Sequence, residues 1–281
     1  MSSLKTTYKE LAIPYFKEVF QIIDKVLREH NIPYYLIGAS AMALEKLKLG
    51  SKLERATKDI DFAIMISSED EYEEILNSLE SHNFVRTNDP WRIFHKEFDI
   101  LIDLLPFGKI EENDSVNFKN NNAELHVLGF AEVLDHAITV EIEEHIANIP
   151  SLHGMLILKL VSWSDRPEQR YNDPYDIFKI IKSYFLMNYN EIVEYHYDLL
   201  DENEFDELKI SSRILGRNAA PILSKYDKLK ERILRVLNEN IQDPINSKIA
   251  EKWAIEHDET IEYAISLLKE LKTGIMERIK G

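Results

Sequence analysis

Residues 58–66, KDIDFAIMI, constrain the fold more than any other stretch of the chain. Apolar and polar side chains alternate along it, and a period of two places successive side chains on opposite faces of a β-strand. The large apolar side chains share one face, namely Ile60, Phe62, Ile64 and Ile66. The other face carries Asp59 and Asp61. The pattern therefore predicts a strand in a sheet with one buried face, and two carboxylates on the opposite face.

Other parts of the first 150 residues also mix helical and strand patterns. Helices are expected at about 15–30, 40–49 and 69–82. Strands are expected at about 32–38, 92–96, 98–105, 124–128 and 138–143. The strands at 92–96 and 98–105 are close enough along the chain to pair antiparallel. These elements predict an N-terminal domain with a mixed sheet and flanking helices.

The character of the chain changes at NIPSLHGMLILKLVSW, residues 148–163. From there on the apolar spacing is helical, and we expect helices at about 151–163, 174–187, 190–199, 203–215, 219–238, 245–254 and 258–279. The fold class is therefore predicted as α+β, with a sheet-containing domain over 1–150 and an all-helical domain over 151–281.

Composition excludes several classes of protein. The chain has no cysteine, which rules out disulfides, thiolate metal sites and a cysteine nucleophile. No run approaches the ~20 apolar residues of a membrane helix, so we expect a cytoplasmic protein without membrane contact. The formal net charge of −16 disfavours extended nucleic-acid binding, although one nucleotide or a short RNA end remains compatible with it.

The two aspartates at Asp59 and Asp61 suggest metal chemistry. Residues i and i+2 of a strand lie about 7 Å apart on one face, where their carboxylates can share hard divalent cations. A third acid is offered by EFDILIDLLPFG, in which Asp99 and Asp103 share a face. The LLPFG that follows Asp103 favours this residue over Asp99. Such a carboxylate set is typical of two-cation sites for phosphoryl displacement.

A glycine turn precedes the acidic strand. In LIGASA the chain passes from strand to helix, so backbone N–H groups of Gly38, Ala39 and Ser40 can hold phosphate oxygens. Arg55 and Thr57 approach the acidic strand and are candidates either for nucleotide contact or for ordinary loop residues.

Three of these stretches together resemble the DNA polymerase β-like nucleotidyltransferase superfamily, namely LIGASAMAL, RATKDIDFAI and ILIDLLPFG. A fourth stretch, LILKLVSWSDRPEQRYNDPYDIFKII, is similar to the lysine and aspartate motifs of AbiEii-type nucleotidyltransferases, the toxins of toxin–antitoxin pairs. The resemblance covers roughly residues 35–180.

The resemblance implies roles for individual residues. Asp59, Asp61 and Asp103 would be catalytic ligands of two Mg²⁺ ions, for which Mn²⁺ would substitute. Gly38 and Ser40 would line the phosphate turn, with Ala39 where the family usually has Gly or Ser.

The resemblance also assigns roles in the helical domain, whose motif would contribute to the cleft. Lys159 would contact nucleotide phosphates, while Asp173 and Asp176 would orient this lysine or assist the acceptor. The sequence also offers simpler alternatives, because Lys159 would also fit at a helix edge and Asp173 before Pro174 fits an N-cap.

The function implied is transfer of NMP from an NTP to an acceptor hydroxyl or phosphate. The acceptor is left open between a tRNA end and a small molecule, and an antitoxin protein is a partner that the resemblance implies. The alternative hypothesis is a module of the same fold that binds a nucleotide or a partner protein with little or no turnover.

Overall fold

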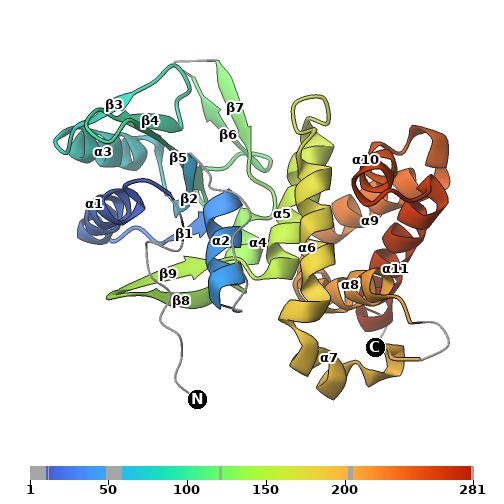
Figure 1. Ribbon diagram of the computed structural model, residues 1–281. Coiled ribbons are helices and arrows are strands. Elements are labelled where there is room, and N and C mark those ends of the chain that lie inside the picture. Colours follow the sequence, from blue (N-terminus) through green and yellow to red (C-terminus); the bar gives the residue numbers. More distant parts are fainter. Residues whose placement is uncertain (1–10, 12, 49–58, 120–121, 202–204, 280–281) are drawn as a thin grey trace. The chain divides into compact units, whose positions relative to one another are not determined.

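The computed structural model describes residues 11, 13–48, 59–119, 122–201 and 205–279 (Figure 1). The chain divides into two compact units, Met1–Ser151 and Leu152–Gly281, here called unit 1 and unit 2. None of the described helices combines the length and the apolar character needed to cross a membrane.

Unit 1 is built on a mixed sheet of five strands in the order β1-β2-β5-β4-β3. The strands are β1 (Tyr34–Ile37), β2 (Asp59–Met65), β5 (Ile100–Phe107), β4 (Arg92–His95) and β3 (Phe84–Arg86). β2 and β5 run parallel, and every other neighbouring pair is antiparallel. The predicted antiparallel pairing of the strands near 92–96 and 98–105 is confirmed.

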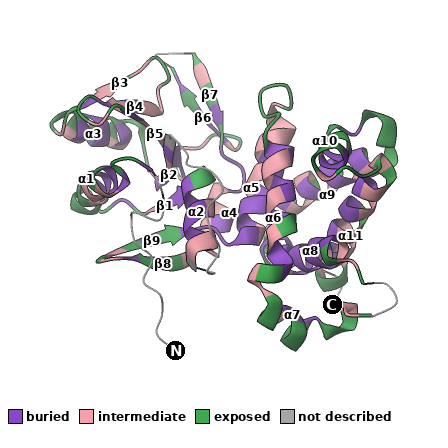
Figure 2. Cartoon of the chain, viewed as in Figure 1, coloured by how far each residue is buried: buried purple, intermediate pink, exposed green. Residues whose placement is uncertain are grey.

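The predicted buried face of β2 is confirmed. β2 is largely buried (Figure 2). Ile60, Phe62 and Ile64 are completely buried, and so is the small Ala63 on the other face, whereas Asp61 is half-buried. Phe20 of helix α1 (Phe16–Glu29) stacks on Phe62, with ring centroids 6.2 Å apart. The apolar face of the sheet is thus covered by a helix, and Asp61 lies on the opposite face.

The remaining elements of unit 1 are short or peripheral. They are the helices α2 (Gly38–Lys48), α3 (Glu69–Glu80) and α4 (Phe130–Leu134) and the hairpins β6–β7 (Ser115–Phe118, Ala123–His126) and β8–β9 (Ile138–Ile142, His145–Ile149). Ser68 caps α3 by accepting a hydrogen bond from the N–H of Glu71. The sequence did not predict β3, β6, β9 or α4, each of which has three to five residues and therefore a weak periodic signal.

All the regular elements described in unit 2 are helices. It contains α5 (Leu152–Asp165), α6 (Asp173–Met187), α7 (Tyr189–Tyr195), α8 (Glu207–Lys225), α9 (Asp227–Gln242), α10 (Lys248–His257) and α11 (Ile261–Ile279), with 3₁₀ turns at Tyr197–Leu199 and Pro244–Asn246. The predicted fold class, a mixed sheet with flanking helices followed by a helical region, is confirmed.

Two predicted helix boundaries are wrong. The sequence suggested helices at 203–215 and 219–238, but α8 runs through Gly216 and Pro221 to Lys225, and α9 begins at Asp227. Gly216 does not end a helix; it lets α8 approach α11. A Cβ atom on Gly216 would lie 2.1 Å from the carbonyl oxygen of Leu271, and one on Gly274 would lie 1.9 Å from that of Arg213.

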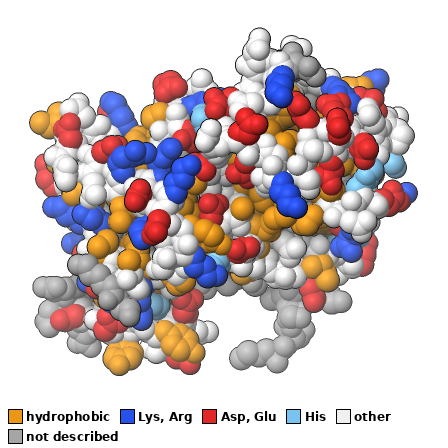
Figure 3. Space-filling view, turned by 180° about the vertical axis from the view of Figure 1, so that it is seen from behind, with side chains coloured by type: hydrophobic (Ala, Val, Ile, Leu, Met, Phe, Trp, Pro, Cys, Tyr) orange, Lys and Arg blue, Asp and Glu red, His pale blue; other side chains and the backbone are white. Residues whose placement is uncertain are grey.

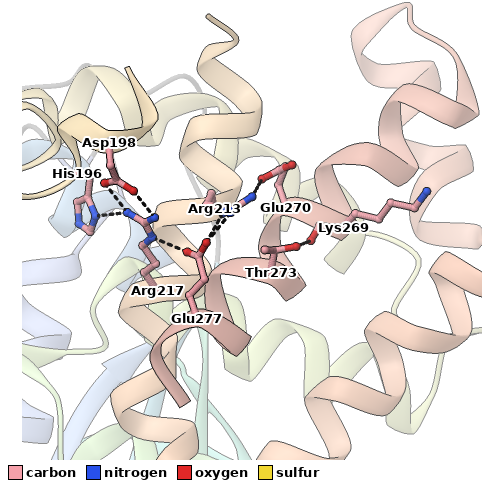
Figure 4. A network of polar contacts seen from close by, with 8 residues as sticks. All are labelled: His196, Asp198, Arg213, Arg217, Lys269, Glu270, Thr273 and Glu277. Atoms are coloured by element: carbon pink, nitrogen blue, oxygen red, sulfur yellow. Dashed lines mark hydrogen bonds and ion pairs between the residues drawn. The ribbon is translucent and has the colours of Figure 1, made fainter. Parts of the chain in front are cut away.

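Charged side chains reinforce the same pair of helices. Arg217 donates hydrogen bonds to Glu277 of α11 and to both carboxylate oxygens of Asp198 (Figure 4). Arg213 donates to Glu270 and Glu277. A cavity of about 320 Å³ adjoins this network and is lined by Tyr195, Tyr197, Asp198, Arg217, Glu277 and Arg278. Its acidic and basic groups balance, and none of the predicted site residues lines it.

Candidate functional site

The centre of the sheet carries a row of facing residues across four strands. Ile37 of β1 pairs with Asp61 of β2, Asp61 pairs with Asp103 of β5, and Asp103 pairs with Arg92 of β4. Neighbouring strands are about 4.8 Å apart, and the side chains of paired residues point to the same face. We call the two acids Asp61 and Asp103, together with the Arg92 that pairs with Asp103, the acidic row. The register therefore brings two of the three predicted carboxylates side by side.

Asp59 lies two residues before Asp61, and its backbone pairs with Leu101. Its side chain lies outside the described part of the structure. Arg55 and Thr57, the two predicted nucleotide contacts before this strand, also lie outside the described residues.

Asp99 and Asp103 were both candidates for the third carboxylate, and they occupy different environments. Asp103 is in β5, and only 14% of its side chain is exposed. Asp99 is exposed in the turn before β5 and has a left-handed backbone with φ 53°. The pairing of β5 with β2 begins at Leu101, opposite Asp59, so Asp99 lies outside the paired segment and Asp103 lies opposite Asp61. The geometry thus favours Asp103.

Arg92 holds the carboxylate of Asp103 from the neighbouring strand. Its Nε donates to Oδ1 at 2.6 Å and its Nη2 donates to Oδ2 at 2.8 Å. Bidentate pairs of this kind are the strongest arginine–carboxylate contacts. Sequence reasoning missed Arg92. The feature that could have indicated Arg92 is the antiparallel pairing of β4 and β5. Once the register of that pairing is known, it places an arginine opposite Asp103.

Gly38 packs against the carboxylate of Asp61. Its backbone has φ +64°, and a Cβ atom built on it would lie 2.1 Å from Oδ2 of Asp61. Both the backbone angle and the lack of space therefore require glycine here. Helix α2 begins at this residue, so its first backbone N–H groups lie beside the acidic row.

The next two residues of the predicted phosphate turn differ in exposure. Ala39 is exposed, whereas Ser40 is completely buried. In this conformation a phosphate at the turn would meet backbone N–H groups and not the Ser40 hydroxyl. The predicted place of Ser40 in the phosphate turn would therefore depend on its backbone N–H.

The donor set suits a hard divalent cation. Asp61 and Asp103 offer carboxylate oxygens from adjacent strands, which is the ligand chemistry that Mg²⁺ and Mn²⁺ prefer. The missing side chain of Gly38 leaves the space that the Asp61 carboxylate fills. Among the described residues no group of three acidic or histidine side chains is arranged for a metal, and the Asp59 side chain is not among them.

Unit 2 contains the second predicted cluster. Lys159 of α5 donates to Oδ1 of Asp173 and Oδ2 of Asp176, both at 2.8 Å. The second oxygen of Asp173 is buried and has no hydrogen-bond partner among the described residues. Burial lowers the pKa of Lys159, but the two carboxylates outweigh it and raise the pKa above its ordinary value. The lysine is therefore held charged between two acids.

The alternative of Asp173 as a helix cap is wrong. Helix α6 begins at Asp173, the cap position belongs to Asn172, and no side chain caps this end. Asp173 is 3% exposed and is directed to Lys159. The indole N–H of Trp253 donates to the carbonyl oxygen of Pro174 and ties α10 to the first turn of α6. The cluster of Lys159, Asp173 and Asp176 thus includes the first turn of α6, which is held by α10.

Comparisons with known proteins give distant structural similarities. No protein-family model matches the chain, and no curated protein matches it. An antigenic nucleotidyltransferase-like protein from Paracoccidioides brasiliensis is 18% identical with a TM-score of 0.39, over 81% of this chain and 93% of that chain.

Two further solved structures are also only distantly similar. The antibiotic-resistance factor ANT(2'')-Ia is 14% identical with a TM-score of 0.39, over 76% of this chain and 94% of its own. The CCA-adding enzyme of Thermotoga maritima, complexed with tRNA, is 12% identical with a TM-score of 0.30, over 100% of this chain and 87% of its own. Scores of this size assign the chain to no family, and the AbiEii resemblance stays a prediction.

Proposed function

We propose that the protein is a metal-dependent nucleotidyltransferase that transfers NMP from an NTP to an acceptor hydroxyl or phosphate. The observation that carries the proposal is the acidic row beside Gly38, where two paired carboxylates meet the start of a helix. Carboxylates can hold cations on the phosphates, and helix N–H groups can hold the triphosphate.

Different residues of the chain would have different roles in the transfer. Asp59 and Asp61 would hold the cations, and Asp103 would help to hold them and accept the acceptor's proton. A carboxylate has about four lone-pair positions, so Asp103 keeps two while Arg92 uses the others. The acceptor oxygen forms a bond to the α-phosphorus, the bond to the bridging oxygen breaks, and pyrophosphate leaves. Bound Mg²⁺ would stabilise the negative charge on the phosphates.

The Lys159 cluster is proposed as a second functional element. Asp173 and Asp176 use two of the three N–H donors of Lys159, and the third donor would contact a phosphate group. The oxygen of Asp173 without a described partner suits a donor from the acceptor, since buried polar atoms are normally hydrogen-bonded.

The acceptor is proposed as either a tRNA end or a small molecule. The net charge of −16 disfavours a long RNA footprint. Basic and acidic side chains are intermixed on the face drawn in Figure 3. Incubation with an NTP labelled at the α-phosphate plus total tRNA, or plus a metabolite extract, separates the two. Label that migrates with tRNA supports the first acceptor, and label in the small-molecule fraction supports the second.

The test of the proposed function is the pair of variants Asp61→Asn and Asp99→Asn. We expect Asp61→Asn to lower nucleotide transfer by at least about 100-fold, because it removes a charged ligand from the acidic row. Asp99→Asn should retain activity, because Asp99 is exposed in a turn and asparagine tolerates its backbone. Pyrophosphate release measures both, and equal activity of the two variants would contradict the proposal.

A nucleotide-binding module without turnover is the second candidate function. The observation that favours it is the bidentate Arg92 contact, which already uses both oxygens of Asp103. Calorimetry with an NTP and Mg²⁺, alongside the pyrophosphate assay, distinguishes the two functions. Binding without pyrophosphate release in the presence of every acceptor fraction would support the module.

A further inference from the structure

We propose that Arg92 makes cation binding at the acidic row depend on the nucleotide, by neutralising Asp103 until a triphosphate arrives. The inference rests on the proposed function, since it assumes that the row binds a divalent cation. Arg92 is a positioning residue here, because it acts through Asp103.

The side chain of Arg92 is directed toward Asp103. It pairs with Asp103 across two antiparallel strands, and its guanidinium forms the 2.6 Å and 2.8 Å bonds to both carboxylate oxygens. Two-thirds of the Arg92 side chain and 86% of the Asp103 side chain are shielded from water. The pair is therefore more than a solvent-exposed ion pair, whose contribution is usually small.

A second arginine of the same sheet, Arg86, makes its ion pairs outside the acidic row. Arg86 of β3 has a similar exposure of 38%, but it donates to Glu73 and Glu80 of α3. That contact joins the sheet to a surface helix and involves no residue of the acidic row. Arg86 is thus a matched control with the same chemistry at a different place.

The charge balance explains the effect on a cation. Arg92 also donates to the exposed Asp89 at 3.4 Å, but its two shorter bonds go to Asp103, so its positive charge offsets the charge of Asp103. The row therefore attracts a divalent ion less than it would if the charge of Asp103 were not offset. A unit positive charge about 6 Å from a divalent ion weakens its binding by about tenfold even in a water-like dielectric. An NTP brings negative charge and oxygen ligands of its own, and these compensate for Arg92.

Reciprocity gives the consequence for the nucleotide. If the NTP tightens cation binding, the cation must tighten NTP binding by the same factor. Arg92 therefore increases the coupling between the two ligands and keeps the ion-free carboxylate in a fixed position.

The experiment titrates Mn²⁺ by electron paramagnetic resonance, with and without a non-hydrolysable NTP. Arg92→Gln should bind Mn²⁺ about tenfold more tightly than the wild type without nucleotide, and the nucleotide should tighten it less. Arg92→Lys keeps the charge and should stay within about threefold of the wild type. Arg86→Gln should stay within about twofold. Unchanged or weaker Mn²⁺ binding by Arg92→Gln would overturn the inference.

A double variant keeps the test decisive if Arg92→Gln alone fails to fold. Arg92→Gln with Asp103→Asn replaces the ion pair by two neutral amides that can still hydrogen-bond. We expect wild-type Mn²⁺ affinity without nucleotide, because the pair has no net charge, and a smaller effect of the nucleotide. Weaker Mn²⁺ binding than wild type without nucleotide would show that Asp103 already attracts the ion and contradict the inference.

Asp61→Asn separates this inference from the proposed function. If wild type shows no Mn²⁺ binding that Asp61→Asn abolishes, with or without nucleotide, the proposed function fails. If that binding exists and Arg92→Gln does not tighten it, only the role of Arg92 fails.

Discussion

At the scale of single residues, the site depends on one close approach. The carboxylate of Asp61 occupies the space where a side chain on residue 38 would be, and the backbone of Gly38 has a positive φ. Glycine thus does two things at once: it permits the turn from β1 into α2 and lets the helix start beside the acid.

Gly38→Ala tests this close approach. We expect a loss of about 1–3 kcal/mol in the free energy of unfolding, because the left-handed backbone is strained for alanine and the carboxylate must move. Nucleotide transfer should fall as Asp61 is displaced. Urea denaturation and the pyrophosphate assay measure the two effects.

Ala39→Gly is the control for Gly38→Ala. Residue 39 is exposed in the same first turn, so the substitution should cost no more than about 1 kcal/mol from helix propensity. Equal losses for Gly38→Ala and Ala39→Gly would show that the contact with Asp61 is unimportant.

At the scale of elements, close helix packing explains the wrong helix boundaries. Gly216 and Gly274 let the backbones of α8 and α11 touch, and the arginine network of Figure 4 borders the same contact. Pro221 removes one N–H from α8, yet the helix continues because both its flanks are packed.

Gly216→Ala tests the packing of α8 on α11. The added Cβ atom would lie 2.1 Å from a backbone carbonyl oxygen, so the helices must separate, and we expect a loss of at least about 2 kcal/mol. Thermal or urea unfolding measures it. A variant as stable as the wild type would contradict the close packing.

Ser212→Ala is the control in the same helix. Its buried hydroxyl has no hydrogen-bond partner among the residues that the structure describes. Removing a hydroxyl that makes no bond should be neutral or slightly stabilising.

At the scale of the whole molecule, each unit buries a histidine whose pKa is lowered. Burial lowers the pKa of His95 in unit 1, which is 1% exposed. Burial, and then the charge of Arg217, lowers the pKa of His196 in unit 2, which is 4% exposed. Both groups prefer to be neutral in the folded chain.

Both units should therefore lose stability in mild acid. Below about pH 6.5 the unfolded chain binds protons that the folded histidines resist, so the free energy of unfolding falls until the pH reaches the folded pKa. Urea denaturation at about pH 7.5 and about pH 5.5 measures the difference.

His196→Gln should reduce this pH dependence in unit 2, because glutamine does not titrate. The carboxylates contribute their own pH dependence, so the comparison is between variant and wild type over the same interval. An unchanged difference between the two pH values would exclude His196 as a contributor.

The sequence by itself determined the local patterns of this protein. It predicted the buried face of β2, two carboxylates on its opposite face, the antiparallel strands near 92–96 and 98–105 and the helical character after residue 150. Periodicity of two or 3.6 residues reflects burial of one face, and this is encoded within a few neighbouring residues. The pairing of Lys159 with Asp173 and Asp176 followed from a resemblance and not from periodicity.

Only the tertiary structure decided which distant residues meet. The register that aligns Asp61 with Asp103, the Arg92 contact and the crossing at Gly216 each join segments that are separated along the chain. No local pattern specifies such contacts, because they depend on which strands and helices become neighbours and on how far each is shifted along the other. The roles of Arg92 in a short strand and of Gly216 in a helix can therefore be recognised only in the folded chain.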